Sequence, residues 1–155
     1  MTCLKQMVDI YEERECGVIG VQQVSEDEVQ SYGVIDGVPI DDRLWRINAL
    51  VEKPAIDQAP SNIAIVGRYI LDASIFKHLE QTDKGKGGEI QLTDAIARQL
   101  KDQAVMAYQF TGKRYDCGDK LGYLQANVEL GLKHEQLSEQ FKAYLKSLVA
   151  DGGIG

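Results

Sequence analysis

An acidic and a basic side chain stand next to each other before a proline, at Glu52, Lys53 and Pro54. Residues 44–53 alternate in a way that predicts a β-strand ending at Lys53. Side chains alternate between the two faces of a strand. Pro54 removes a backbone donor and favours extended geometry at Lys53, which suits a strand end that opens onto a cleft. The expected faces are Trp45, Ile47, Ala49, Val51 and Lys53 on one side, and Leu50 and Glu52 on the other.

Two interpretations of this strand end remain open. A lysine followed by a proline commonly blunts an edge strand and protects it from pairing with other chains, and that role alone would explain Lys53 and Pro54. Alternatively, Glu52 and Lys53 form a functional pair at the lip of a cleft.

A second candidate for chemistry is the segment Asp116-Cys117-Gly118-Asp119. Asp116 follows a predicted strand and precedes a predicted helix, a position that suits a Mg²⁺ ligand, because this hard cation prefers carboxylate oxygen. Asp119 fits the N-cap of the following helix better. On residue types alone, both aspartates could equally be caps or turn residues.

The stretch 82–88 contains Lys84, Gly85, Lys86, Gly87 and Gly88. It lacks the GxxxxGK[ST] pattern of a phosphate-binding loop, so we expect a mobile surface loop. Glu89 follows it at the predicted entry of a helix, where the helix dipole stabilises a carboxylate.

The remaining pattern predicts helices and strands in an α/β order with a mixed sheet. A first helix after the N-cap Thr2 precedes a buried strand, and an Asp36-Gly37 hairpin turn follows the strand beginning at Tyr32. Gly67 lies inside an alternating strand, 62–71, and Asp72 caps a short helix. The apolar stripes of the predicted helices are Leu4, Met7, Val8 and Tyr11; Ile75, Phe76 and Leu79, which are expected to face inward; and Leu92, Ile96, Gln99 and Leu100. Two closing helices carry narrow stripes, as in a helical hairpin or a subunit contact: Leu121, Leu124, Val128 and Leu132, and Leu137, Phe141, Tyr144 and Leu148.

Composition limits the function classes. Apolar residues make up 44% and charged residues 26% of the 155-residue chain, as in an ordinary globular domain. A net charge of −7 argues against a broad nucleic-acid interface, and a phosphate ligand would need a locally basic pocket. No apolar run approaches the roughly 20 residues of a membrane span, so we expect a cytoplasmic protein. Cys3, Cys16 and Cys117 have neither disulfide nor zinc spacing.

Four blocks, in this order, resemble bacterial UTP–glucose-1-phosphate uridylyltransferases. The resemblance runs from about residue 4 to about residue 148 but matches only the C-terminal half of that family. The family's glycine-rich nucleotide-binding loop has no counterpart here. The blocks are Leu50-Val51-Glu52-Lys53-Pro54; Ala59-Pro60-Ser61-Asn62-Ile63-Ala64-Ile65-Val66-Gly67-Arg68-Tyr69; Gly88-Glu89-Ile90-Gln91-Leu92-Thr93-Asp94-Ala95-Ile96; and Asp116-Cys117-Gly118-Asp119-Lys120-Leu121-Gly122-Tyr123.

The resemblance implies a three-layer, Rossmann-like nucleotide-diphospho-sugar transferase fold, with a mixed sheet and without its nucleotide-binding half. It implies that residues 1–118 form the sugar-binding part and residues 119–149 a C-terminal helical hairpin that could make a dimer contact. Residues 150–155 would form a flexible tail. A homo-oligomer is expected on the same basis.

The implied reaction is the transfer of UMP from UTP to glucose 1-phosphate, giving UDP-glucose and pyrophosphate. By resemblance, Lys53 would meet the sugar phosphate as the catalytic charge, Glu52 would accept hydrogen bonds from hexose hydroxyls, and Asp116 would hold Mg²⁺. UTP would bind only with the missing half, so we expect this chain alone to be inactive. The implied substrate-binding residues are Gly33, Glu52, Lys53, Val66, Gly67 and Glu89.

Two alternatives remain. A sibling nucleotidyltransferase that uses thymidine or cytidine triphosphate would share these blocks, since the base is read in the absent half. A non-catalytic binding or assembly domain derived from the same fold would share them too.

Overall fold

The computed structural model describes residues 1–85 and 88–152, which divide into two compact units, Met1–Gly112 and Lys113–Gly155. Each unit is described by itself. Lys86 and Gly87 of the predicted loop, and residues 153–155 of the predicted tail, lie outside the described residues. The division expected from the family resemblance, into a sugar-binding part (1–118) and a helical hairpin (119–149), stays a prediction.

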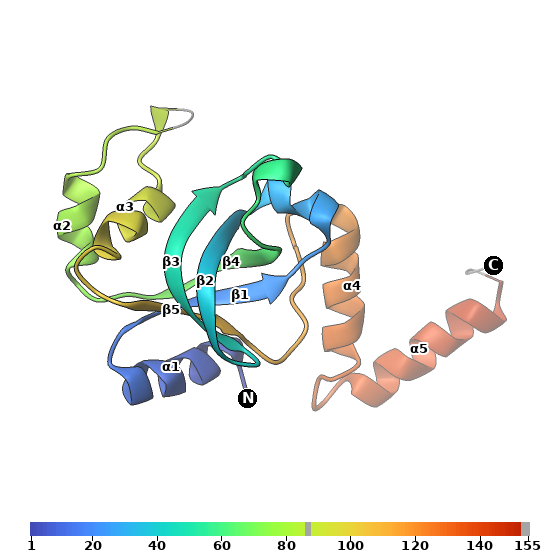
Figure 1. Cartoon of the computed structure of the whole chain (residues 1–155). Helices are drawn as coiled ribbons and strands as arrows, with labels where there is room; N and C mark the ends of the chain where they lie inside the picture. Colours follow the sequence, from blue (N-terminus) through green and yellow to red (C-terminus); the bar gives the residue numbers. More distant parts are fainter. Residues whose placement is uncertain (86–87, 153–155) are drawn as a thin grey trace. The chain divides into compact units, whose positions relative to one another are not determined.

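The first unit is built on a mixed sheet whose strand order is β1-β4-β2-β3-β5 and which closes where β5 pairs with β1 (Figure 1). The β1–β5 pair is parallel and the other pairs are antiparallel, which confirms the expected mixed sheet. The strands are β1 (Gly17–Gln23), β2 (Gly33–Asp41), β3 (Leu44–Glu52), β4 (Ile63–Ile70) and β5 (Val105–Gln109).

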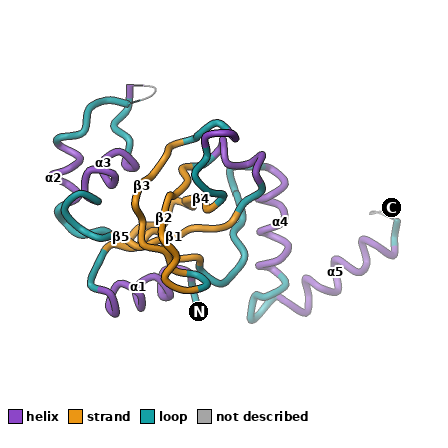
Figure 2. Tube along the Cα trace, viewed as in Figure 1, coloured by secondary structure: helices purple, strands orange, loops and turns teal. Residues whose placement is uncertain are grey.

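Within the first unit, helices α1, α2 and α3 lie outside the strands, as Figure 2 shows. Helix α1 packs against β1 and β4, α3 packs against β3, and α2 packs against α3. Thr2 caps α1 as predicted, its hydroxyl accepting a hydrogen bond from the Lys5 N–H. The elements are α1 (Cys3–Arg14), α2 (Ile75–Glu80), α3 (Leu92–Gln99) and the 3₁₀ helices η1 (Glu26–Ser31) and η2 (Ile56–Gln58). No helix in the described residues combines the length and apolar character needed to cross a membrane.

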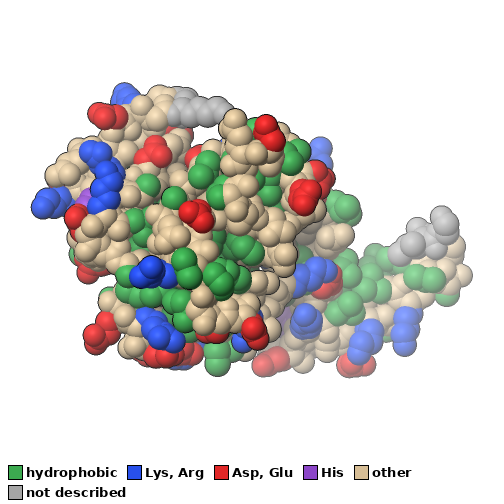
Figure 3. Space-filling view, in the orientation of Figure 1, with side chains coloured by type: hydrophobic (Ala, Val, Ile, Leu, Met, Phe, Trp, Pro, Cys, Tyr) green, Lys and Arg blue, Asp and Glu red, His purple; other side chains and the backbone are tan. Residues whose placement is uncertain are grey.

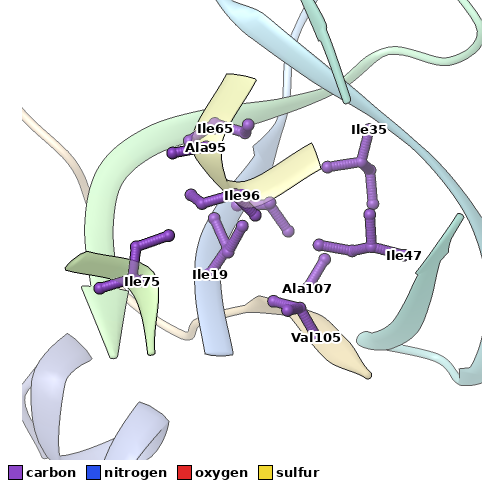
Figure 4. Close-up of a cluster of buried hydrophobic side chains, with 10 residues drawn as sticks. Ile19, Ile35, Ile47, Ile65, Ile75, Ala95, Ile96, Val105 and Ala107 are labelled. Carbon is purple, nitrogen blue, oxygen red and sulfur yellow. The ribbon is translucent and has the colours of Figure 1, made fainter. Parts of the chain in front are cut away.

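Apolar side chains from the strands, α2 and α3 form the core of this unit (Figure 4). The inward stripe predicted for α3 is confirmed, with Ile96 and Gln99 fully buried. The prediction for Phe76 is wrong, because its side chain is 67% exposed, whereas Ile75 and His78 are buried. Neighbouring helical positions point about 100° apart, so a helix as short as α2 cannot turn both Ile75 and Phe76 inward.

The hairpin turn predicted at Asp36-Gly37 is also wrong. Strand β2 runs through these residues, and the turn lies at residues 42–43, where the Asp41 carboxylate accepts a hydrogen bond from the Arg43 N–H. Asp36 pairs with Ala49 and Gly37 with Ile47, so β3 carries one extra residue between them. A Cβ on Gly37 would lie 2.9 Å from the Arg46 carbonyl oxygen. The glycine therefore serves a β-bulge rather than a turn.

This bulge changes which side chains of β3 share a face. Ile47 is buried and Leu50 packs against the same core cluster, although strict alternation places them on opposite faces. Val51 is 36% exposed and does not join Ile47. The predicted alternation from Trp45 to Lys53 is therefore wrong, because one inserted residue reverses the facing of everything beyond it.

The second unit contains α4 (Lys120–Gly131) and α5 (Ser138–Ala150). Asp119 caps α4 as predicted, its carboxylate accepting a hydrogen bond from the Gly122 N–H at 2.8 Å. Leu121 and Leu124, on the narrow apolar stripe predicted for α4, are 63% and 60% exposed.

Candidate functional site

Glu52, the last residue of β3, faces Gly33, the first residue of β2. A Cβ on Gly33 would lie 3.0 Å from Glu52 Oε2, so the glycine makes room for the carboxylate. The same oxygen accepts a hydrogen bond from the hydroxyl of Thr93, on α3, at 3.4 Å. Thr93 is 7% exposed and Glu52 is half-buried. The carboxylate thus accepts one hydrogen bond, from Thr93, in a space that Gly33 leaves open at the end of the strand.

Tyr69, on β4, belongs to the same neighbourhood. Burial raises the pKa of its phenol, and the negative charge of Glu52 raises it further. At neutral pH the phenol is therefore protonated, and a protonated phenol can donate a hydrogen bond. Strands β2, β3 and β4 and helix α3 together position one acceptor, Glu52, with hydroxyl groups nearby.

Sequence reasoning assigned no role to Thr93 or Tyr69, although both lie in the blocks that carry the family resemblance. A usable signal was present for Thr93, a polar residue beside Leu92, on the apolar stripe predicted for this helix.

Lys53 does not have the extended geometry predicted for it. Its φ is +46°, in the left-handed region, and its N–H donates to the Tyr32 carbonyl at 3.0 Å. The Lys53 side chain is exposed, whereas Pro54 is buried. A following proline favours extended backbone at the residue before it. At Lys53 this preference is overridden, because the chain turns inward between the exposed Lys53 and the buried Pro54.

Val66 and Gly67 lie at a bulge of β4. Gly20 pairs with Arg68 and Val21 with Ile65, which leaves Val66 and Gly67 without a rung on β1. Gly67 has φ +71°, and no described atom lies within 4 Å of the Cβ position. Its conformation therefore requires glycine, and the regular alternation predicted through 62–71 is wrong at this point. The substrate contacts of Val66 and Gly67 stay predictions.

Glu89 lies before α3, not at its entry. The N-cap of α3 is Gln91, and Asp94 is the acidic residue of the first turn. Glu89 is exposed, and its carbonyl accepts a hydrogen bond from the Gly85 N–H at 2.9 Å. Glu89 therefore belongs to the loop that precedes α3 and not to the helix itself. Its role as a substrate contact stays a prediction.

Asp116 lies in the second unit, between β5 and α4 in the sequence. Its Oδ2 is 3.1 Å from Arg114 Nη2, and its Oδ1 accepts a hydrogen bond from the Gly118 N–H at 3.0 Å. No group of three His, Cys, Asp or Glu side chains able to hold a metal ion occurs in the part of the chain that is described. A carboxylate paired with a guanidinium does not by itself fit a Mg²⁺ site, which needs further oxygen ligands.

The charge of the surface as a whole does not attract anions, so an anion would have to be bound by a local basic group. In Figure 3, Lys and Arg side chains are interspersed with Asp and Glu on the visible face. The chain as a whole carries a net charge of −7. Attraction for a phosphate at the end of β3 therefore depends on a nearby cation such as Lys53.

Residues 2–132 match the model of the family described as nucleotidyl transferase. The chain belongs to the nucleotidyl transferase family. It is 52% identical over 123 residues to a UTP–glucose-1-phosphate uridylyltransferase of Pseudomonas aeruginosa, covering 79% of this chain and 44% of that protein. It is 47% identical over 145 residues to one of Staphylococcus epidermidis, covering 94% and 50%.

Solved nucleotidyl transferase structures agree. A UDP-glucose pyrophosphorylase complexed with UDP-glucose matches with a TM-score of 0.79 and 44% identity, covering 84% of this chain and 50% of that one. A UTP-bound enzyme from Acinetobacter baumannii matches with a TM-score of 0.82 and 39% identity, covering 94% and 50%. The chain thus spans about half the length of these relatives, as expected from the four blocks, and the family is confirmed.

The space under Gly33 can be tested by adding a methyl group. We expect Gly33→Ala to lower the free energy of unfolding by about 1–3 kcal/mol, because its Cβ must displace the Glu52 carboxylate or Ile65. Gly17→Ala is the matched control on β1, since its Cβ meets ordinary contacts at 3.4–3.5 Å. Denaturant unfolding of both variants measures the difference, and equal losses would contradict the close approach at Gly33.

Gly122 offers a similar test of the Asp116 segment. An Ala in a free helix stabilises it by up to about 1 kcal/mol relative to Gly. Here a Cβ on Gly122 would lie 2.2 Å from the Asp116 carbonyl oxygen. We therefore expect Gly122→Ala to destabilise the chain by about 1–3 kcal/mol and to speed amide exchange at residues 116–118. Gln125→Ala, at an exposed position of α4, should change stability by less than about 0.5 kcal/mol.

Proposed function

We propose that this chain supplies the sugar-phosphate side of an enzyme that transfers UMP from UTP to glucose 1-phosphate, forming UDP-glucose and pyrophosphate. The observation that carries the proposal is the end of β3, where the held carboxylate of Glu52 adjoins the exposed ammonium of Lys53. The names of the relatives that are 47–52% identical support the choice of substrates.

In this proposal Glu52 accepts hydrogen bonds from hexose hydroxyls. A carboxylate that already accepts a hydrogen bond from Thr93 loses less freedom when it binds, so less of the binding energy is used to order it. The protonated phenol of Tyr69 and the hydroxyl of Thr93 add polar groups that suit a sugar.

Lys53 binds the phosphate of the sugar substrate. Both reactants are anions, so catalysis depends mainly on positioning and on neutralising charge. An ammonium group is a compact point charge that offsets the repulsion between the two approaching phosphates. No covalent nucleophile is required from the chain.

Gly33, Val66, Gly67 and Glu89 complete the proposed sugar contacts. The bulge at Val66 and Gly67 supports this, because an exposed glycine without a Cβ allows a ligand to approach the backbone. Contact by Glu89 would come from its loop rather than from α3.

The nucleotide base of the proposed reaction is inferred from the relatives. A putative glucose-1-phosphate thymidylyltransferase from Bacillus anthracis shares the fold, with a TM-score of 0.63 but only 22% identity. The higher identities to uridylyltransferases favour UTP. We propose that UTP binds with residues beyond this chain. A homo-oligomer through the exposed apolar side chains of α4, such as Leu121 and Leu124, is also proposed.

Titration of this chain with glucose 1-phosphate tests the sugar-phosphate site. We expect NMR shift changes near Glu52, Lys53 and Gly67, and at least about tenfold weaker binding in Lys53→Ala, because the ammonium attracts the phosphate. Lys77→Ala removes another exposed lysine of the first unit and should bind normally. If glucose 1-phosphate and UDP-glucose cause no shift changes at all, a non-catalytic assembly domain is favoured instead.

Mg²⁺ is proposed for the complete enzyme, with Asp116 as one ligand. On this chain alone we expect only weak, millimolar Mg²⁺ binding, because Arg114 already pairs with the carboxylate and the other ligands are not among the described residues. Shift changes at Asp116 during a MgCl₂ titration measure it, with Asp116→Asn as the control. Tight binding that survives Asp116→Asn would remove Asp116 from this role.

A further inference from the structure

We propose that Pro54 is a positioning residue, whose buried ring holds the backbone of Lys53 in the left-handed conformation and so fixes where the ammonium group leaves the end of β3. The inference rests on the phosphate-binding role proposed for Lys53. It concerns how that side chain is presented, which the proposed function leaves open.

Lys53 carries an unusual backbone conformation for its place in the fold. Among the described residues, Glu15 and Lys53 are the non-glycine residues with positive φ, at +51° and +46°. Glu15 is the C-cap of α1, and its N–H donates to the Tyr11 carbonyl at 2.8 Å, which is an ordinary setting for a left-handed residue. Lys53 ends a strand and precedes a proline, so no helix cap explains its conformation.

The ladder between β2 and β3 holds Lys53 from one side. Its N–H donates to the Tyr32 carbonyl, one rung beyond the Gly33–Glu52 pair. Tyr32 is itself fixed, because its N–H donates to the carbonyl of Val29, which is 2% exposed at the end of η1. The amide of Lys53 is therefore tied to a well-packed turn.

Pro54 holds Lys53 from the other side. It has no N–H, so the ladder cannot continue past Lys53, and its ring is buried, whereas Lys53 and Ala55 are exposed. A following proline also disfavours the right-handed helical conformation at residue 53. With the amide tied to Tyr32 and the ring drawn into the protein, the chain must turn inward at Lys53.

Glycine would adopt this conformation at little cost, yet the position holds a lysine. Strain of this kind persists where the surroundings over-determine the backbone, and it is concentrated at functional sites. The consequence for chemistry is that the Lys53 side chain departs from the pleat of β3 along one fixed direction. An ammonium group already aimed at a phosphate needs less ordering when the ligand binds.

A double-mutant cycle on this chain tests the backbone part of the proposal. In the chain that retains Pro54, we expect the melting temperature of Lys53→Gly to be about 2–4 °C above that of Lys53→Ala, because glycine relieves the backbone strain. With Pro54→Ala, which removes most of the buried ring and restores the N–H, the difference should fall below about 1 °C. Pro54→Val keeps a buried apolar side chain and is the matched control, in which most of the difference should remain. The same melting difference in the Pro54 and Pro54→Ala backgrounds, or none with Pro54 present, overturns the proposal.

Lys77 supplies the control for the glycine effect. It lies inside α2, where glycine is the poorer residue, so Lys77→Gly should melt below Lys77→Ala. If glycine raises the melting temperature relative to alanine at Lys53 but lowers it at Lys77, the gain at Lys53 comes from the local φ and not from glycine in general.

Ligand titration separates positioning from a merely structural role. We expect Pro54→Ala to weaken glucose 1-phosphate binding about tenfold and to leave methyl α-glucoside binding unchanged, because only the phosphate is met by Lys53. Equal weakening of both ligands makes Pro54 structural and overturns the proposal. If the cycle shows the coupling but the unaltered chain binds no glucose 1-phosphate, the proposed function fails and the backbone inference stands.

Discussion

The pairing of β2 with β3 up to the Gly33–Glu52 rung is the constraint on which the candidate site depends. It brings a backbone without a side chain against a carboxylate, and the next rung ties the Lys53 amide to Tyr32. Moving this register by one residue would exchange the faces of both strands, so the core and the site are fixed by the same ladder. The bulge at Gly37 allows this, because it lets Ile47 and Leu50 both pack inward while the strand end keeps its pairing.

The two charges of the site are treated in opposite ways by their surroundings. Glu52 is half-buried and hydrogen-bonded by Thr93, and its charge is felt by the buried phenol of Tyr69. Lys53 is exposed and constrained through its backbone alone. A partly buried carboxylate makes stronger hydrogen bonds to neutral hydroxyls, because the local dielectric is lower. An ammonium group that binds a phosphate can instead remain hydrated until the ligand arrives. The arrangement therefore suits a ligand with a neutral body and an anionic end.

Much of the fold followed from periodicity, while the details of the site did not. The strands containing Val18, Ile65 and Val105 and the stripe of α3 were predictable, because burial imposes a regular pattern on long segments. The bulges at Gly37 and Gly67 and the backbone conformation of Lys53 were not predicted, since a bulge or a left-handed residue depends on what lies across the sheet and leaves no periodic trace. Thr93 was missed because its partner, Glu52, lies 41 positions away in the sequence.

The same limit explains why residue types identified Glu52 and Lys53 but not their geometry. Acid, base and proline in a row indicate a strand end, and the pre-proline preference then predicts an extended lysine. That preference is a local term, and the burial of Pro54 together with one hydrogen bond to Tyr32 outweighs it. The conformation of Lys53 therefore depends on tertiary contacts, which set the direction in which its side chain leaves the end of the strand. The proposed phosphate-binding role would make use of that direction, whereas a blunted edge strand would not need it.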